Sequence, residues 1–119
     1  MATDKKQTNG RVKQEYDRLI EIFKDIPQDK MKVVDGLVTQ AARLRVMLDS
    51  AWDDIVDNGD YEQFTQSPST PAYERERPVA KLFNQRDAAY QKIIFQLVKM
   101  LPEEKVEEVK AEFGEGDLT

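Results

Sequence analysis

The sequence has 119 residues, of which 39% are hydrophobic and 34% are charged, with 18 basic against 23 acidic side chains and a formal net charge of −5. This length suits one domain with one modest hydrophobic core. Histidine and cysteine are both absent, which excludes disulfides, thiolate nucleophiles, Cys/His zinc sites, imidazole bases and Ser-His-Asp triads. No apolar stretch approaches the roughly 20 residues of a membrane span, and the first residues lack the apolar core of a signal peptide, so we expect a soluble intracellular protein without a membrane partner.

The first segment, residues 1–11, is polar and has no apolar periodicity, so we expect a flexible arm. This arm and the residues directly after it are basic, with Lys5, Lys6, Arg11 and Lys13. From Val12 to Ile26 the apolar residues recur with a helical period, and Pro27 ends the pattern. The pattern predicts a first helix over about residues 12–26.

The next segment carries the strongest structural signal, an apolar residue at alternating spacings of three and four. These residues are Val34, Leu37, Ala41, Leu44, Leu48, Ala51 and Ile55. Such a heptad seam predicts a long helix over about residues 29–57, roughly 42 Å in length. Further apolar residues beside the seam, including Trp52 and Val56, indicate more than one neighbouring helix. Gly36 within this helix indicates close backbone approach or simple tolerance.

Residues 58–70 form a turn-rich connection, and connections of this length usually have a function. A third helix is predicted over about residues 72–101, because Val79, Phe83, Tyr90, Ile93, Leu97 and Met100 keep the heptad spacing. Pro102 ends it and opens a segment, residues 102–119, that predicts a short acidic helix and tail. Residues 12–101 therefore form an all-α domain in which the second and third helices pair as a long antiparallel hairpin.

The same hairpin is expected to mediate oligomerisation, because it is long, its core is small and both helices carry apolar residues on more than one face. A monomer in which the heptad residues are plain core is the alternative. The residues that we assign to this core or oligomer seam are Val34, Leu37, Leu44, Leu48, Ile55, Phe83, Tyr90, Ile93 and Leu97.

Five aspartates near the end of the second helix, at positions 49, 53, 54, 57 and 60, could suggest a calcium site. A calcium loop needs an oxygen ligand at the position of Val56 and a bidentate glutamate at the position of Thr65, so the match fails. We therefore interpret the cluster as a solvated helix end, with Arg45 as the partner of Asp49. No glycine-rich loop precedes a helix with the lysine spacing of a nucleotide site. We therefore expect no catalytic residue, no metal and no cofactor.

The basic residues Lys5, Lys6, Arg11 and Lys13 are candidates for contact with double-stranded DNA, since a cationic arm can follow a phosphate backbone without reading its sequence. An ordinary solubilising arm is the alternative. An oligomer would present the arm many times and add weak contacts together. Residues 1–50 have 10 basic and 8 acidic side chains, so the negative charge lies in the remainder of the chain.

Residues 73–102 have a recognisable pattern. It consists of Tyr73-Glu74-Arg75-Glu76-Arg77-Pro78-Val79-Ala80-Lys81-Leu82-Phe83-Asn84, then Tyr90-Gln91-Lys92-Ile93-Ile94, Leu97 and Leu101-Pro102. This segment resembles the C-terminal half of phage terminase small subunits, and the long helix and Ser-Pro-rich linker before it are more loosely similar to the same family. The clear resemblance covers 30 of the 119 residues.

The resemblance implies a non-enzymatic DNA-packaging component in the cytoplasm of a bacterial host. Such proteins assemble as rings through helical hairpins, bind viral DNA, and recruit and regulate the large subunit, which holds the ATPase and nuclease. The C-terminal segment of the family meets the large subunit or the portal, and the matching residues here are Glu103, Glu104, Glu107, Glu108 and Phe113. The chain departs from the family in having only the arm and one helix where the family has a helix-turn-helix.

Two alternatives come from other functional classes. The first is a helical adaptor that binds only protein, with its last helix in a groove of the partner. The second is an acidic mimic of DNA, against which the basic residues mixed among the acids argue.

Overall fold

The structure is a computed structural model that describes the backbone of residues 2–113 and the side chains of residues 5–113. Its elements are α1 (Ala2–Ile22), the 3₁₀ turn η1 (Gln28–Lys30), α2 (Met31–Asn58), β1 (Tyr61–Phe64), β2 (Tyr73–Glu76), α3 (Pro78–Lys99) and α4 (Glu103–Phe113). The predicted mostly helical class is confirmed. The small sheet was not predicted, and the end of the predicted acidic tail, residues 114–119, lies outside the described residues.

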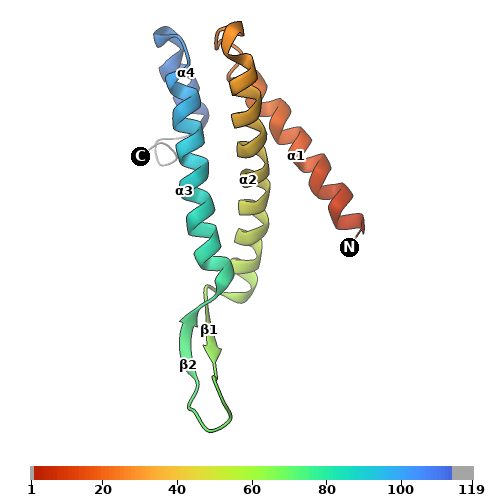
Figure 1. The fold of residues 1–119 in the computed structure, drawn as a ribbon, viewed down its shortest axis with the longest axis vertical. Helices are drawn as coiled ribbons and strands as arrows, with labels where there is room; N and C mark the ends of the chain where they lie inside the picture. The colour runs from red at the N-terminus through yellow and green to blue at the C-terminus, as the bar shows by residue number, and fades with distance from the viewer. Residues whose placement is uncertain (1, 114–119) are drawn as a thin grey trace.

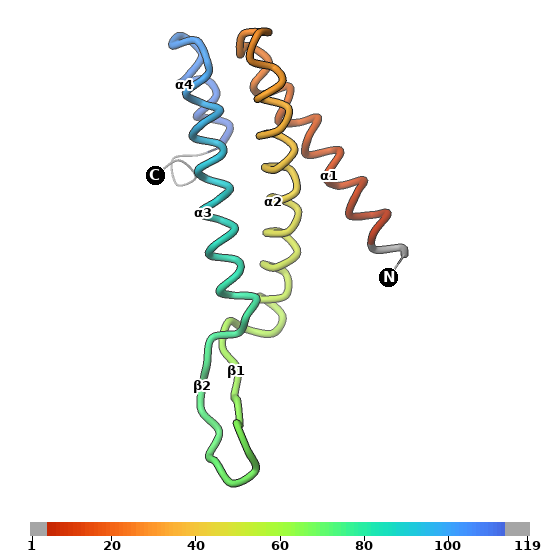
Figure 2. Tube along the Cα trace, viewed as in Figure 1, coloured from red at the N-terminus to blue at the C-terminus, as the bar shows by residue number. Residues whose placement is uncertain are grey.

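The two longest helices, α2 and α3, lie side by side and run in opposite directions (Figure 1). The β1–β2 hairpin joins them at one end and extends beyond them. At the other end α1 packs against α2, and α4 folds back against α3. The N-terminal half of α1 leans away from the helix pair, as the chain trace shows (Figure 2).

The resulting molecule is elongated, with principal extents of 62 × 35 × 21 Å. Its radius of gyration is 18.2 Å, whereas a compact domain of this length has about 13.5 Å. An elongated chain buries less of its apolar surface against itself than a compact one does. Apolar side chains are therefore left in contact with solvent.

The hydrophobic core lies where all four helices meet. Leu19, Phe23 and Ile26 enter it from α1 and the turn that follows, and each is at most 2% exposed. The ring of Phe113 on α4 stacks on Phe23 with 5.8 Å between the ring centres. Other buried members come from the two long helices: Val34, Val38, Ala41, Ala42, Leu48, Tyr90, Ile93, Ile94, Leu97 and Val98.

The prediction of a flexible arm over residues 1–11 is wrong for residues 2–11, which belong to α1. The segment after Val12 is already held as a helix by packing, and extending a formed helix adds a hydrogen bond for each residue without a new nucleation cost. Lysine, glutamine and arginine in this stretch also favour helix. At its other end α1 stops at Ile22 rather than at residue 26, and Ile26 reaches the core from a turn.

The prediction of an irregular connection followed by a helix from residue 72 is also wrong. Residues 61–64 and 73–76 pair as antiparallel strands, with Phe64 opposite Tyr73 and Glu62 opposite Arg75. The Arg75 guanidinium lies 3.6 Å from the centre of the Phe64 ring and also bonds Glu62. The helix starts only at Pro78, because a proline disfavours helical geometry at the residue before it, and Arg77 accordingly has an extended backbone with φ −68° and ψ 143°.

The bounds of the second helix were predicted well. The expected range of about 29–57 compares with Met31–Asn58, and η1 occupies the residues just before it. Gly59 ends the helix with a φ of 83°, a conformation that residues with a Cβ adopt at a cost.

Candidate functional site

The predicted seam residues lie within the chain's own core. Five of them are buried, namely Val34, Leu48, Tyr90, Ile93 and Leu97, and the other four, Leu37, Leu44, Ile55 and Phe83, are partly exposed. The buried five make their contacts inside one copy of the chain. A contact between copies would therefore use other apolar residues.

Apolar residues of that kind occur near the β-hairpin end of α2. Val38, Ala42 and Val46 are buried in the half of α2 on which α1 packs. Further along the helix α1 has turned away, and Trp52 and Val56 are 55% and 65% exposed. We call Trp52 and Val56 the front patch. Trp52 also packs on Phe83 of α3, with 5.9 Å between the ring centres.

The four cations proposed for DNA contact are all exposed on α1. At 100° per residue Lys6 and Lys13 share one face of the helix, whereas Lys5 and Arg11 each face another direction. Lys13 forms an ion pair with Asp17 at 3.0 Å. The structure therefore does not bring the four cations together on a single face.

One of the four, Arg11, instead lies beside two arginines that the sequence analysis did not assign to DNA. Arg18 of α1 and Arg45 of α2 line, with Arg11, a hollow of about 310 Å³ between the two helices. The remaining lining residues are Gln14, Glu15, Val46 and Asp49. The spacing of Arg11 and Arg18, two helical turns apart on one face, is the signal that could have indicated this site.

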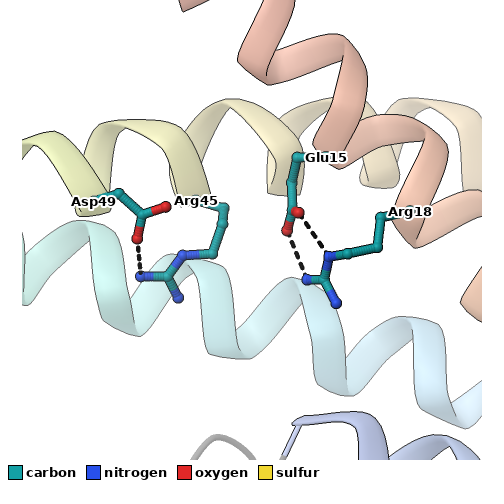
Figure 3. Close-up of polar contacts among 4 residues, drawn as sticks. All are labelled: Glu15, Arg18, Arg45 and Asp49. Carbon is teal, nitrogen blue, oxygen red and sulfur yellow. Dashed lines mark hydrogen bonds and ion pairs between the residues drawn. The ribbon is translucent and has the colours of Figure 1, made fainter.

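Acidic neighbours hold two of these arginines in place (Figure 3). Arg18 donates from Nε and Nη2 to the two carboxylate oxygens of Glu15, both at 2.7 Å. Arg45 donates from Nη2 to Asp49 at 3.1 Å, and its guanidinium lies 5.1 Å from the centre of the Tyr90 ring. Arg11 forms no ion pair with any side chain of residues 5–113.

The pKa values of one group in the hollow, Arg18, and of one group beside it, Tyr90, are raised. The hydrogen bond to Glu15 raises the pKa of Arg18. Burial raises the pKa of the Tyr90 phenol, so this group stays protonated at neutral pH. Because Glu15 and Asp49 pair with Arg18 and Arg45, the guanidinium group of Arg11 is the one in the hollow without an ion pair among residues 5–113 and is the group that could bind an anion such as a phosphate.

The aspartate cluster is divided between separate structural contacts. Asp54 accepts hydrogen bonds from Asn58 at 2.7 Å and from Arg77 at 3.0 Å, while Asp49 pairs with Arg45. Arg77 also donates to the carbonyl oxygen of Gly59 at 2.6 Å and thereby fastens the β-hairpin to the end of α2. Within the described part of the chain, no three acidic residues are grouped so that they could hold a metal ion.

The residues proposed for partner binding fall into two groups. Glu103, Glu104, Glu107 and Glu108 are exposed on α4. Phe113 is only 6% exposed and packs on Phe23, so it stabilises the core and is not accessible to a partner in this conformation. The accessible partner surface on α4 therefore consists of the acidic residues.

Comparison of the chain with protein-family models, curated proteins and solved structures finds no match. Among the described residues, no helix combines the length and the apolar character that crossing a membrane requires.

Proposed function

We propose that this chain is a non-catalytic DNA-packaging component of the terminase small-subunit type. In this role it forms a ring-like homo-oligomer, binds double-stranded viral DNA, and recruits and regulates the large ATPase–nuclease subunit or contacts the portal. The resemblance of residues 73–102 supports the family, and Arg77 and Pro78 of that segment form the junction between the hairpin and α3. The observation that carries the assembly is the exposed apolar surface of an elongated helix pair.

The accessible surface of the chain is larger than that of a compact monomer. The accessible surface is 8335 Å², whereas a compact monomer of this mass exposes about 6,600 Å². A standard interface removes about 800 Å² from each partner. The excess follows from the elongated shape, which leaves apolar side chains such as Trp52 and Val56 exposed.

Contact with DNA would use the N-terminal half of α1 together with the arginine-lined hollow. Lys5, Lys6, Arg11 and Lys13 are exposed there, and the lean of α1 away from the helix pair makes several of its faces accessible. Phosphate contacts from lysine and arginine bind DNA without sequence preference. The acidic residues of α4 are exposed and available to a protein partner, although Glu108 lies close to Arg18, with which it lines another hollow.

The mass of the protein in solution is the first test. We expect an oligomer at micromolar concentrations in light scattering and native mass spectrometry. A monomer throughout this range would exclude the ring.

The second test measures DNA binding. We expect filter retention of duplex DNA that falls as salt rises from 50 to 200 mM, because phosphate contacts release counterions. Replacement of Lys5, Lys6, Arg11 and Lys13 by alanine should leave the helical content unchanged and weaken retention about tenfold or more. A control with four exposed lysines elsewhere, at positions 81, 92, 99 and 110, changed to alanine should retain DNA more strongly than this variant.

A helical adaptor that binds only protein remains the second candidate. It is favoured by the neutralisation of Lys13, Arg18 and Arg45 by acidic neighbours. It predicts a monomeric or dimeric protein that shows no salt-dependent retention of DNA.

A further inference from the structure

A second exposed surface runs along the opposite side of α2. Val33, Gly36, Gln40, Arg43 and Met47 follow one another at alternating spacings of three and four, and all five are exposed. Val33 is 56% and Met47 37% exposed. We call these five residues the back stripe. Their heptad spacing is the pattern with which one helix packs along another, yet α1 and α3 both contact other faces of α2.

The glycine in this stripe has no explanation inside the chain. A Cβ at Gly36 would meet no atom within 4 Å, and glycine within a helix costs about 0.5–1 kcal/mol relative to alanine. Small residues on a helix surface allow a second helix to approach closely. Gly10 has the same open surroundings, so the space beside Gly36 permits the approach of an external helix and does not identify one.

The back stripe and the front patch differ in chemistry. Arg43 lies on the back stripe, with exposed Lys32 beside it, whereas Asp53 and Asp57 border the front patch. Among residues 5–113 none of these four side chains forms an ion pair. One surface is apolar and basic, and the other is apolar and acidic.

The Arg43–Met47 end of the back stripe matches the front patch in spacing. At 100° per residue Met47 and Trp52 project about 140° apart, on nearly opposite sides of α2. The pairs Arg43 and Met47, Trp52 and Val56, and Asp53 and Asp57 each span one helical turn, about 6 Å. The front patch lies on the same face of α2 that α1 covers in the first half of the helix. Because α1 does not reach the patch, another helix could pack there.

We propose that the occupant of the front patch is the back stripe of a second copy of this chain. This inference rests on the proposed oligomer and identifies its contact. Met47 of one copy packs against Trp52 and Val56 of the next, and Arg43, one helical turn from Met47, pairs with Asp53 and Asp57. Because the two surfaces are different, the contact is head to tail, and repetition of it closes a ring or extends a filament.

The test uses two variants whose changed side chains are all exposed. The first is blocked at the back stripe by Arg43→Glu with Met47→Glu, and the second is blocked at the front by Asp53→Arg with Asp57→Arg. Like charges brought together at a contact oppose association strongly, so we expect each variant alone to be monomeric, with a dissociation constant raised about 100-fold or more. Circular dichroism should show wild-type helical content in both.

Mixing the two variants decides between contact geometries. One intact front and one intact back remain, and the two reversed surfaces also carry opposite charges, so we expect the mixture to associate in native mass spectrometry into species of alternating variants, from a one-to-one dimer upward. A control variant, Lys92→Glu with Gln96→Glu on α3, should keep the wild-type mass. Suppose that the wild type is an oligomer. The head-to-tail contact is then contradicted, and the oligomer is not, if both blocked variants keep the wild-type mass or if their mixture stays monomeric. A monomeric wild type would contradict both the oligomer and the contact.

Discussion

Individual side chains divide between those that hold the chain together and those that face outward. Leu97 is fully buried between the helices, and Phe113, expected at a partner surface, closes the core against Phe23. Arg77 joins the β-hairpin to α2 through Asp54 and Gly59. Burial could be anticipated for Leu97 because apolar residues recur every three or four positions around it. The partner of Arg77 could not be anticipated, because it lies 23 residues away along the chain.

A charge at Leu97 tests the buried seam. Leu97→Asp places an unpaired carboxylate in the core and should lower the free energy of unfolding by about 3–5 kcal/mol, with a smaller loss for Leu44→Asp at its partly exposed position. Urea unfolding followed by circular dichroism measures the change. Gln96→Asp, on the exposed neighbour, is the control and should stay within about 0.5 kcal/mol of wild type. An unchanged midpoint for Leu97→Asp would show that this position is not buried.

The contact between Arg77 and Asp54 predicts a pH dependence. Hydrogen bonds from Asn58 first and Arg77 second hold the pKa of Asp54 below its ordinary value of 3.8. A carboxylate favoured by the fold stabilises it above the ordinary pKa, and this contribution is lost as the pH falls through the folded-state pKa. We expect Arg77→Met to raise the Asp54 pKa in a carboxyl NMR titration.

The stability difference between wild type and Arg77→Met should accordingly shrink as the pH is lowered from 6 to 2. Lys81→Met, at an exposed position on α3, is the matched control and should leave the Asp54 titration as it is in wild type. An Asp54 titration that is the same in all three proteins would contradict the assigned ion pair.

At the scale of elements, the bounds of α2 could be predicted closely, whereas the start of α3 and the ends of the other elements could not. The heptad pattern of α2 set its bounds to within about two residues, because its apolar face and its flanking turn residues agree. The β-hairpin carried no comparable signal, since its strands have four residues each and are mostly exposed. The N-terminal half of α1 has no apolar face at all, so its helical state depends on continuity with the packed half.

Substitution of Gly10 tests the extent of α1. Gly10 lies within the helix, and a Cβ there would meet no atom within 4 Å. We expect Gly10→Ala to raise the free energy of unfolding by about 0.5–1 kcal/mol and to increase helical content slightly. Gly59→Ala is the control and should lower the free energy of unfolding, because a residue with a side chain disfavours the φ of 83° at this position. A Gly10→Ala variant with unchanged stability and helicity would show that residues 2–11 are not helical in solution.

The whole molecule is an elongated helix pair with a bundle at one end and a β-hairpin at the other (Figure 1). The bundle end is covered by α1 and α4, whereas the hairpin end has only two helices and leaves the front patch exposed. Apolar side chains are exposed on both sides of α2, and the proposed contact with further copies would cover them.

Assembly of this kind makes stability depend on concentration. A contact that forms only between folded chains shifts the unfolding equilibrium by mass action, so we expect the melting temperature to rise between 1 and 100 μM protein. Differential scanning calorimetry over that range measures it, and the front-blocked variant Asp53→Arg with Asp57→Arg should show no such rise. The same melting temperature for wild type at every concentration would contradict assembly through folded subunits.

The sequence by itself determined the helical class, the two long helices and their buried faces, because a period of 3.6 residues follows directly from helix geometry. The absence of histidine and cysteine likewise excluded imidazole and thiolate chemistry without any structure. Only the tertiary structure decided which apolar residues stay exposed, how Arg77 anchors the hairpin, and that Arg11, Arg18 and Arg45 converge on one hollow. These features depend on where α1 leaves α2 and on contacts between residues far apart in the chain, which local periodicity does not encode.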